Sequence, residues 1–238
     1  MRERELMLDI FRCPIDGSRF VSKWKCEKGH EFSEIDNIIN FLQDQEVEGD
    51  KLLETIAPIY EPLWAPLGFF ITSHASYSSV LRSISNYLNG NVVVDVGTGT
   101  GKVFDYVNCE ICIGIDISFK FLKILSKKRS KVIPVRADVR SIPLQSEVAD
   151  SVSALLVIHM LPSKLSALKE IFRILKHKGR FASIILTNNN SISRFLAKWW
   201  KIELYSVDYY IKLFREIGFE EVSYKKMGAW TLFTCAKP

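Results

Sequence analysis

Three alternate glycines are the residues best suited to hold a ligand: the apolar run Val92–Val94 leads into Gly97, Gly99 and Gly101. A short β-branched run without charges is typical of a parallel strand that is buried on both faces. Because glycine has no Cβ and adopts positive φ at low cost, a ligand can lie against the backbone of such a loop. Ligands of open α/β sheets bind at the carboxyl ends of the strands. The pattern therefore predicts a small-molecule site between this strand and a following helix.

Three acidic side chains accompany this loop. Asp95 lies two residues before the first glycine, and Asp116 and Asp138 end the next two apolar runs. An acid about 20 residues after the first glycine is placed to accept hydrogen bonds from both hydroxyls of a ribose. Lys102 stands where a dinucleotide-binding loop would have its third glycine. Since a carboxylate beside the loop favours a cationic ligand over a pyrophosphate, the pattern indicates a positively charged nucleoside.

A second set of residues offers the donor atoms that zinc binds. Cys13 and Asp16 are followed by Cys26 and His30, and the spacing looks like a zinc ribbon in which Asp replaces the second Cys. Zinc accepts thiolate, imidazole and carboxylate in a tetrahedral set, so these four residues predict a metal site and make Zn a second expected cofactor. The alternative is a degenerate ribbon that packing alone holds, with Asp16 as a turn residue.

The remaining cysteines carry a different expectation. Cys109 and Cys112 have Cys-x-x-Cys spacing, but Cys112 begins an apolar run. The chain has five cysteines, an odd number, and no recognisable secretion signal. Because disulfides are rare in the cytosol, we interpret both residues as structural thiols.

Alternating apolar runs and amphipathic stretches must position these groups. The pattern predicts a parallel sheet with helices on both faces and a final antiparallel hairpin, because a short turn joins the last two runs. The fold class is α/β, a Rossmann-like sheet of seven mostly parallel strands with a C-terminal β-hairpin. Strands are expected at 92–94, 112–117, 132–135, 151–157, 180–186, 220–224 and 230–236, and helices at 119–128, 165–175 and 209–217.

Two regions precede this sheet and differ from it in pattern. Tight turns and alternating apolar residues in the first region are typical of short strands, so we expect residues 1–46 to form a small zinc-ribbon-like module. Residues 47–90 have apolar side chains at helical spacing, which prolines interrupt. We assign them as a helical entry segment of one large domain, 47–238.

Composition limits the class of protein. The chain has 238 residues, of which 47% are hydrophobic and 25% charged, as in ordinary globular proteins. No stretch approaches the roughly 18 apolar residues of a membrane span, and with no secretion signal the expected location is cytoplasmic. The net charge of +5 permits an anionic partner, such as RNA or an acidic membrane surface, and requires neither.

Several motifs, in order, resemble those of class I S-adenosylmethionine (SAM)-dependent methyltransferases. Residues 95–101 are Asp-Val-Gly-Thr-Gly-Thr-Gly, 114–118 are Gly-Ile-Asp-Ile-Ser, and 137–144 are Ala-Asp-Val-Arg-Ser-Ile-Pro-Leu. Together with 149–162 and 168–180, they are similar to successive motifs of the type-11 methyltransferase domain, and the resemblance extends from about Val92 to the C-terminus. His-Lys-Gly at 177–179 departs from the usual Pro-Gly-Gly.

The resemblance implies a SAM site at the glycine loop. The loop would hold the methionine part, Asp95 would anchor its amino end directly or through water, Asp116 would bind the ribose and Asp138 the adenine. The alternative is that these acids are helix caps or solvated loop residues. The full expected cofactor-binding set is Asp95, Gly97, Thr98, Gly99, Gly101, Asp116, Ile117, Asp138 and Val139.

Catalysis should require few dedicated side chains. Methyl transfer from a sulfonium is an in-line displacement that needs position and a dry site, and a general base helps only if the acceptor must lose a proton. His159 follows the fourth strand, and a neutral imidazole can accept a proton near pH 7; the alternative is a pocket wall. Tyr60 is the second catalytic candidate, because residues 56–61 resemble the entry segment of quinone-type C-methyltransferases; the alternative is core packing.

The stretch 188–206 combines aromatic and cationic side chains. Phe195, Trp199 and Trp200 alternate with Arg194 and Lys198. Such a segment can cover an apolar substrate, meet a lipid surface or stack on bases, so peripheral membrane contact is one expectation for residues 194–201. The alternative is a lid that packs on the core.

The resemblance predicts a SAM-dependent methyltransferase whose acceptor is a small or lipid-like molecule, such as a quinone precursor. The N-terminal module is similar to the modules that precede rRNA guanine-N1 methyltransferases and to zinc-ribbon activator subunits of methyltransferases, which keeps an RNA methyltransferase open. A non-catalytic SAM-binding module that regulates a partner is a third interpretation.

Overall fold

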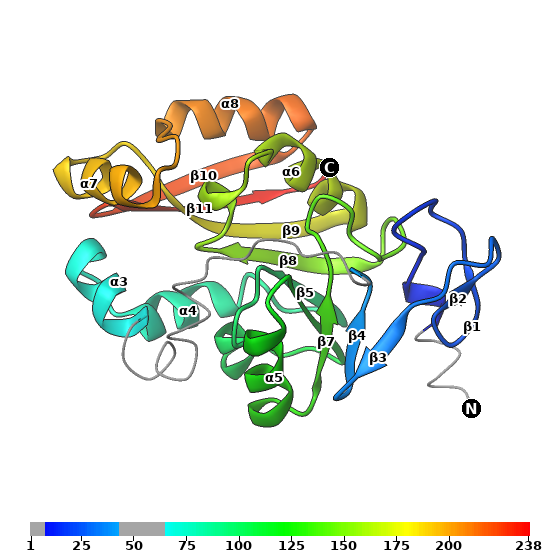
Figure 1. Ribbon diagram of the computed structural model, residues 1–238. Helices are drawn as coiled ribbons and strands as arrows, with labels where there is room; N and C mark the ends of the chain where they lie inside the picture. Colours follow the sequence, from blue (N-terminus) through cyan, green and yellow to red (C-terminus); the bar gives the residue numbers. More distant parts are fainter. Residues whose placement is uncertain (1–7, 43–64) are drawn as a thin grey trace.

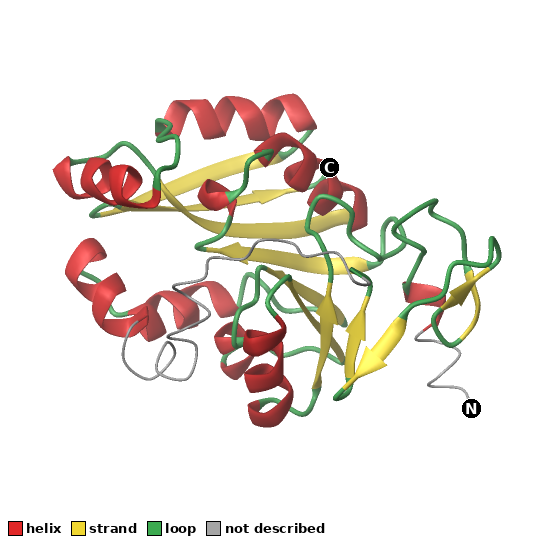
Figure 2. Cartoon of the chain, in the orientation of Figure 1, coloured by secondary structure: helices red, strands yellow, loops and turns green. Residues whose placement is uncertain are grey.

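The computed structural model describes residues 8–42 and 65–238, and a nine-stranded mixed sheet forms its centre (Figures 1 and 2). The strand order is β10-β11-β9-β8-β5-β6-β7-β4-β3, and β1 and β2 form a separate pair. The strand bounds are β1 Phe20–Ser22, β2 Lys25–Cys26, β3 Ser33–Ile35, β4 Ile38–Asn40, β5 Val92–Val96, β6 Ile111–Asp116, β7 Val132–Arg136, β8 Ala149–Leu155, β9 Leu175–Leu186, β10 Glu220–Met227 and β11 Trp230–Ala236.

Five adjacent strands, β9-β8-β5-β6-β7, run parallel and confirm the predicted Rossmann-like arrangement. From β5 the chain adds β6 and β7 on one side, and then returns to add β8 and β9 on the other side. The strand order therefore reverses between β5 and β8, and open α/β sheets bind ligands in the crevice at such a switch point. The C-terminal hairpin, β10-β11, is antiparallel as expected.

Helices cover both faces of the sheet (Figure 1). Side chains of α6 and α8 are buried in the main core on one face, while α4, α7 and α5 contribute to two clusters on the other. The helix bounds are α3 Ala65–Ser73, α4 Tyr77–Ser85, α5 Phe119–Lys128, α6 Lys164–Ile174, α7 Ser191–Trp200 and α8 Val207–Ile217, with short 3-10 helices η2 Lys102–Asp105 and η3 Ile158–Met160.

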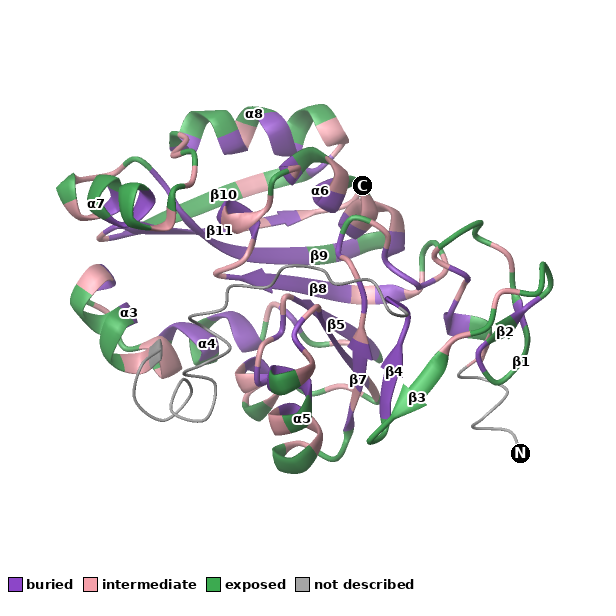
Figure 3. Cartoon of the chain, in the orientation of Figure 1, coloured by how far each residue is buried: buried purple, intermediate pink, exposed green. Residues whose placement is uncertain are grey.

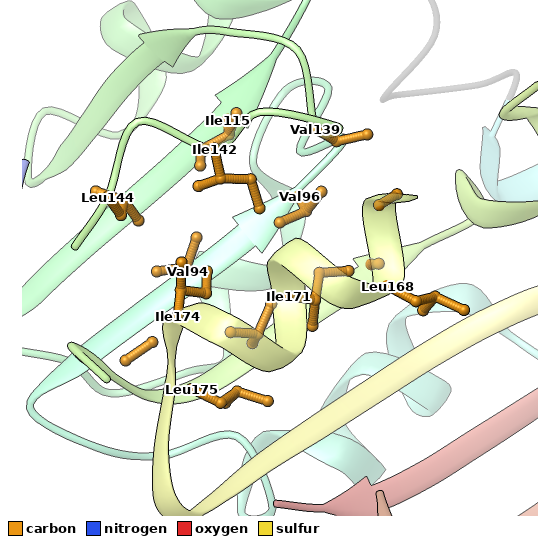
Figure 4. Close-up of a cluster of buried hydrophobic side chains, with 14 of the residues drawn as sticks. Val94, Val96, Ile115, Val139, Ile142, Leu144, Leu168, Ile171, Ile174 and Leu175 are labelled. Atoms are coloured by element: carbon orange, nitrogen blue, oxygen red, sulfur yellow. The ribbon is translucent and has the colours of Figure 1, made fainter. Parts of the chain in front are cut away.

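Helix α6 illustrates how the apolar pattern supports the site. Its side chains Leu168, Ile171 and Ile174 are fully buried, and they lie in one cluster with Val94 and Val96 of β5 (Figure 4). Full burial of such a side chain contributes about 1.5–3 kcal/mol. The packing therefore fixes β5, and with it the loop at its carboxyl end.

The sheet has two strands more than the seven that the sequence predicted. Strand β4 pairs with β7 in parallel, with Ile39 opposite Val135, and β3 pairs with β4 through a turn in which Asp36 and Asn37 have positive φ. All residues of β4, which lies between β7 and β3, are buried (Figure 3). The hairpin thus covers an edge of β7 that would otherwise be unpaired. A three-residue strand of sequence Ile-Ile-Asn gives no indication of the strand with which it will pair.

Two local predictions were wrong. The helix expected after the glycine loop is the single 3-10 turn η2, because only nine residues separate Gly101 from the start of β6 at Ile111 and leave no room for a longer helix. Cys109 and Cys112 form a disulfide instead of remaining thiols. Their Cα atoms lie 5.6 Å apart, within the range that a disulfide spans.

Candidate functional site

The loop after β5 has positive φ at all three glycines: 66° at Gly97, 54° at Gly99 and 78° at Gly101. A Cβ on Gly97 would lie 2.5 Å from the Val157 side chain, and one on Gly101 would lie 2.8 Å from Leu125. A Cβ on Gly99 would meet no described atom within 4 Å. The outer glycines thus allow close packing, and Gly99 presents bare backbone to open space.

Asp116, at the end of β6, holds the loop in this conformation. Its Oδ2 accepts a hydrogen bond from the Gly99 amide at 2.8 Å, and its Oδ1 accepts one from the Ser118 amide, also at 2.8 Å. The side chain is buried, with 9% exposure, and lies beside the loop that it holds. The carboxylate predicted from the sequence therefore has a structural task as well as a position beside the expected ligand.

Asp95, within β5, is 3% exposed. Burial, with a smaller contribution from the nearby Asp116 carboxylate, raises its pKa from 3.8 to about 7, against the hydrogen bond from Ser153 Oγ at 2.5 Å. The carboxyl group therefore changes its charge near neutral pH. A cation bound beside it would favour the ionised form.

Asp138 follows β7 and differs from expectation in one respect. Its carboxylate is paired with Arg140, whose Nε lies 2.9 Å from Oδ2, and its Oδ1 accepts the Arg140 amide at 2.8 Å. Burial opposes ionisation, but these bonds outweigh it and lower the pKa. This pair was not predicted from the sequence, although Asp138 lies only two residues before Arg140. Any ligand amino group would have to share this carboxylate with Arg140.

The remaining members of the predicted set contribute less directly. Thr98 is buried, and its amide donates to the Ile115 carbonyl at 2.9 Å. The Ile117 carbonyl accepts from Arg136 Nε at 3.0 Å. Val139 is 4% exposed and belongs to the same core cluster as Ile142 (Figure 4). These residues support the shape of the site from behind.

A pocket lies in front of the loop, and two helices outside the motifs help to form it. Pro66 of α3 and Tyr77 and Ser78 of α4 line it opposite the glycines, together with Leu155 and Leu156 at the end of β8. Tyr77 and Ser78 were not predicted as site residues, because nothing in their local pattern distinguishes them from other residues of an amphipathic helix. Only the packing of α4 brings them to the loop.

His159, in η3 after β8, is 2% exposed, and its Nδ1 has no hydrogen-bond partner in the described part of the chain. Burial lowers its pKa to about 3, and the charge of Lys164 acts in the same direction. The imidazole packs against Trp230, with ring centroids 5.2 Å apart, and against Trp200 at 6.2 Å. It is therefore a neutral group in an aromatic wall. Tyr60, the other catalytic candidate, lies outside the described residues.

The structure brings the four predicted metal ligands together. One donor atom from each of Cys13, Asp16, Cys26 and His30 falls within 4.8 Å of the others. His30 Nδ1 lies 3.5 Å from Cys13 Sγ, 3.4 Å from Cys26 Sγ and 3.3 Å from Asp16 Oδ2. Two sulfurs, one imidazole nitrogen and one carboxylate oxygen form a donor set that suits Zn²⁺.

This cluster is attached to the body of the protein through aromatic side chains. Both cysteines are buried in the main core cluster, which also contains Phe11, Trp24 and Phe41. The ring centroids are 5.2 Å apart for Phe11–Trp24 and 5.5 Å apart for Trp24–Phe41. The Ser141 hydroxyl donates to the Pro14 carbonyl at 2.8 Å. The N-terminal segment is thus packed against the segment that follows Asp138.

Comparison with known proteins supports the resemblance to methyltransferases that the sequence motifs indicated. Residues 94–183 match the family model described as a methyltransferase domain. The chain is 28% identical over 134 residues, 55% of its length, to a tRNA (carboxymethyluridine(34)-5-O)-methyltransferase from Arabidopsis thaliana, and 33% identical over 96 residues, 37% of its length, to a malonyl-[acyl-carrier protein] O-methyltransferase from Marinomonas sp.. These matches span 33% and 36% of the two relatives.

Solved structures share the fold. A SAM-dependent methyltransferase from Thermotoga maritima has a TM-score of 0.64 at 23% identity, and the match covers 79% of this chain and 98% of that one. A chain from the complex of the Haloferax volcanii Trm112 methyltransferase activator with a methyltransferase has a TM-score of 0.66 at 16% identity, covering 81% and 100%. Among the described residues, every helix is too short or too polar to cross a bilayer.

Proposed function

We propose, from the premise that residues 94–183 are a methyltransferase domain, that this protein transfers the methyl group of SAM to a small or lipid-like acceptor. The observation that carries the proposal is the bare backbone of Gly99 at the switch point of the sheet, with Asp95 and Asp116 beside it. A ligand without phosphates and with positive charge suits this arrangement of carboxylates. The division into a module, 1–46, and a methyltransferase domain, 47–238, belongs to the same proposal.

The residues would divide the binding of SAM among them. The glycine loop would lie along the methionine part, and Asp95 would face its ammonium group. Asp116 would accept hydrogen bonds from the ribose while it holds the Gly99 amide. Asp138, partly neutralised by Arg140, would accept from the adenine amino group. SAM itself supplies the electrophilic methyl group when bound, so the protein needs mainly to orient it and to exclude water.

The side of the site on which we place the acceptor is apolar. His159, Trp200 and Trp230 form an aromatic wall behind the end of β8. With its pKa lowered to about 3, His159 is neutral at physiological pH, and its buried Nδ1 has no hydrogen-bond partner among the described residues. This wall favours an aromatic or lipid-like acceptor, and the role of His159 is to position it.

An RNA acceptor is the second candidate function. It is favoured by the ribbon-like arrangement of metal ligands and by the relative that acts on tRNA. RNA binding that neutralises several phosphates falls steeply as salt rises. An affinity for RNA with that salt dependence, together with methylated RNA as product, would replace the lead proposal.

The deciding experiment uses methyl-labelled SAM and a fractionated cell extract. We expect label in the lipid or small-metabolite fraction. Label in RNA supports the second candidate. SAM binding without transfer to any fraction indicates a non-catalytic module and contradicts the proposed activity.

Asp116→Asn tests the ribose-binding role. The amide keeps an acceptor oxygen for one backbone amide but loses the charge and the second acceptor, so we expect SAM affinity to fall by about tenfold or more. Calorimetric titration measures the affinity, and a thermal melt checks the fold. An unchanged affinity in a folded variant would remove Asp116 from the ribose site.

Zn²⁺ held by Cys13, Asp16, Cys26 and His30 is a structural part of the same proposal. We expect about one zinc per chain by elemental analysis, and a lower melting temperature after chelation, because binding of the metal favours the folded state. Cys26→Ser should lose the metal. Cys235→Ser is the matched control, since Cys235 is also a buried free thiol but lies in β11. A folded protein without zinc would contradict the site.

A further inference from the structure

Helix α7 presents an unusual outer face. Apart from Ser191, its exposed side chains are Phe195 and Trp199, which are 66% and 52% exposed, and the cations Arg194 and Lys198. The helix contains no acid, and Lys201 caps its C-terminus. Large aromatic rings are seldom left in water next to cations only, and an aromatic-basic helix face is typical of helices that lie in a membrane interface.

A second apolar face lies at the same end of the molecule (Figure 1). Helix α3 carries no charge, and its residues Leu67, Phe70 and Ile71 are 52%, 55% and 57% exposed. Figure 3 shows several exposed residues along α3 and along α7. The end of the protein thus combines a purely apolar face with a basic-aromatic one.

Trp230 of β11 joins the two helices. Its Nε1 donates to Thr72 Oγ1 of α3 at 2.8 Å, and its ring centroid lies 6.1 Å from Phe69 of α3 and 6.3 Å from Trp200 of α7. Both helices are therefore anchored on one buried side chain. Their outer faces can meet a single flat partner without a change in the fold.

We propose that the outer faces of α3 and α7 dock on an anionic phospholipid bilayer. The apolar side chains enter the boundary between headgroups and acyl chains, while Arg194, Lys198 and Lys201 contact anionic headgroups. Charge complementarity selects this partner, because the face of α7 is exclusively cationic. A bilayer fits better than RNA, since α3 offers no cation to pair with phosphates and both helices expose aliphatic or aromatic surface.

The docked face continues into the aromatic wall that contains His159. Trp199 stacks on Trp200, with ring centroids 6.3 Å apart and planes at 2°, and Trp200 packs against His159. A lipid-like acceptor could pass from the bilayer along these rings to the aromatic wall. This consequence for the acceptor rests on the proposed function, whereas the docking itself does not.

Co-sedimentation with vesicles tests the docking. The full chain is mixed with vesicles of phosphatidylcholine alone or of phosphatidylcholine with phosphatidylglycerol. We expect binding to the anionic vesicles, a blue shift of tryptophan emission, and quenching by brominated acyl chains. Phe195→Ala with Trp199→Ala should weaken binding by about tenfold or more, and Lys198→Glu by about fivefold or more. These side chains are exposed, so the melting temperatures of the variants should equal that of the wild-type protein.

Matched controls lie away from the two helices. Tyr224 of β10 is 48% exposed, and Tyr224→Ala removes an exposed aromatic ring elsewhere. Lys120→Glu reverses an exposed charge on α5. Neither should change vesicle binding.

The outcomes separate the docking from the proposed function. Absence of binding to anionic vesicles, equal loss of binding in the control variants, or binding only to a single-stranded RNA oligonucleotide overturns the docking. Calorimetry with SAM is run on the same samples. SAM binding without vesicle binding leaves the proposed function intact, and vesicle binding without SAM binding leaves the docking intact.

Discussion

Gly99→Arg should abolish SAM binding while the protein stays folded. The Gly99 backbone faces open space, with no described atom within 4 Å of a Cβ built there, so the arginine side chain would extend into the volume proposed for the cofactor. We expect affinity to fall by about a hundredfold or more, which corresponds to about 2.8 kcal/mol. Calorimetric titration with SAM measures the effect.

Gly99→Ala is the matched control at the same position. Both variants force a side chain into positive φ, 54° here, and therefore share the backbone strain. Only arginine adds bulk in front of the loop. Equal affinities for the two variants, at equal melting temperatures, would mean that the cofactor lies elsewhere.

Asp95→Asn should raise the stability of the ligand-free protein at pH 8 and weaken SAM binding. Burial raises the Asp95 pKa from 3.8 to about 7, so the folded state holds the proton more tightly than the unfolded state. An acid of this kind costs stability as pH rises from about 4 through 7, by up to about 4 kcal/mol. Asparagine is never ionised and can still accept the bond from Ser153.

Urea unfolding between pH 5 and pH 8 measures this difference. The wild-type protein should lose stability relative to Asp95→Asn across that window. Asp150→Asn is the control of opposite sign. The bond from Lys176 Nζ at 2.7 Å and that from the Val92 amide hold the pKa of Asp150 below its ordinary value despite burial, so its loss should destabilise the protein at neutral pH. A pH-independent difference between wild type and Asp95→Asn would contradict the raised pKa.

The same variant tests the ammonium-binding role of Asp95. Only the ionised carboxyl attracts a cation, so the affinity of the wild-type protein for SAM should rise as pH passes through about 7. For Asp95→Asn the affinity should be lower by about tenfold or more at pH 8 and independent of pH. Parallel pH profiles for both proteins would leave Asp95 with a structural role only.

The sequence alone identified the central part of this protein. Apart from the helix expected after the glycine loop, the strands and the helices α5, α6 and α8 agree with the structure, because they depend on local patterns: β-branched runs for the strands and apolar residues at helical spacing for the helices. The glycine loop could be found for the same reason. Positive φ and close packing require glycine at positions 97 and 101, and the spacing of these glycines can be recognised in the amino-acid sequence.

Tertiary structure decided what those groups can do. The protonation of Asp95 and His159 depends on burial by segments far away in the chain. The β3–β4 hairpin pairs with the edge of β7, and the packing of α4 places Tyr77 beside the glycine loop. Both depend on contacts between segments that are distant in the sequence. Local sequence sets backbone conformation and donor type, whereas burial, pairing and pKa arise from contacts between distant residues, which no local pattern encodes.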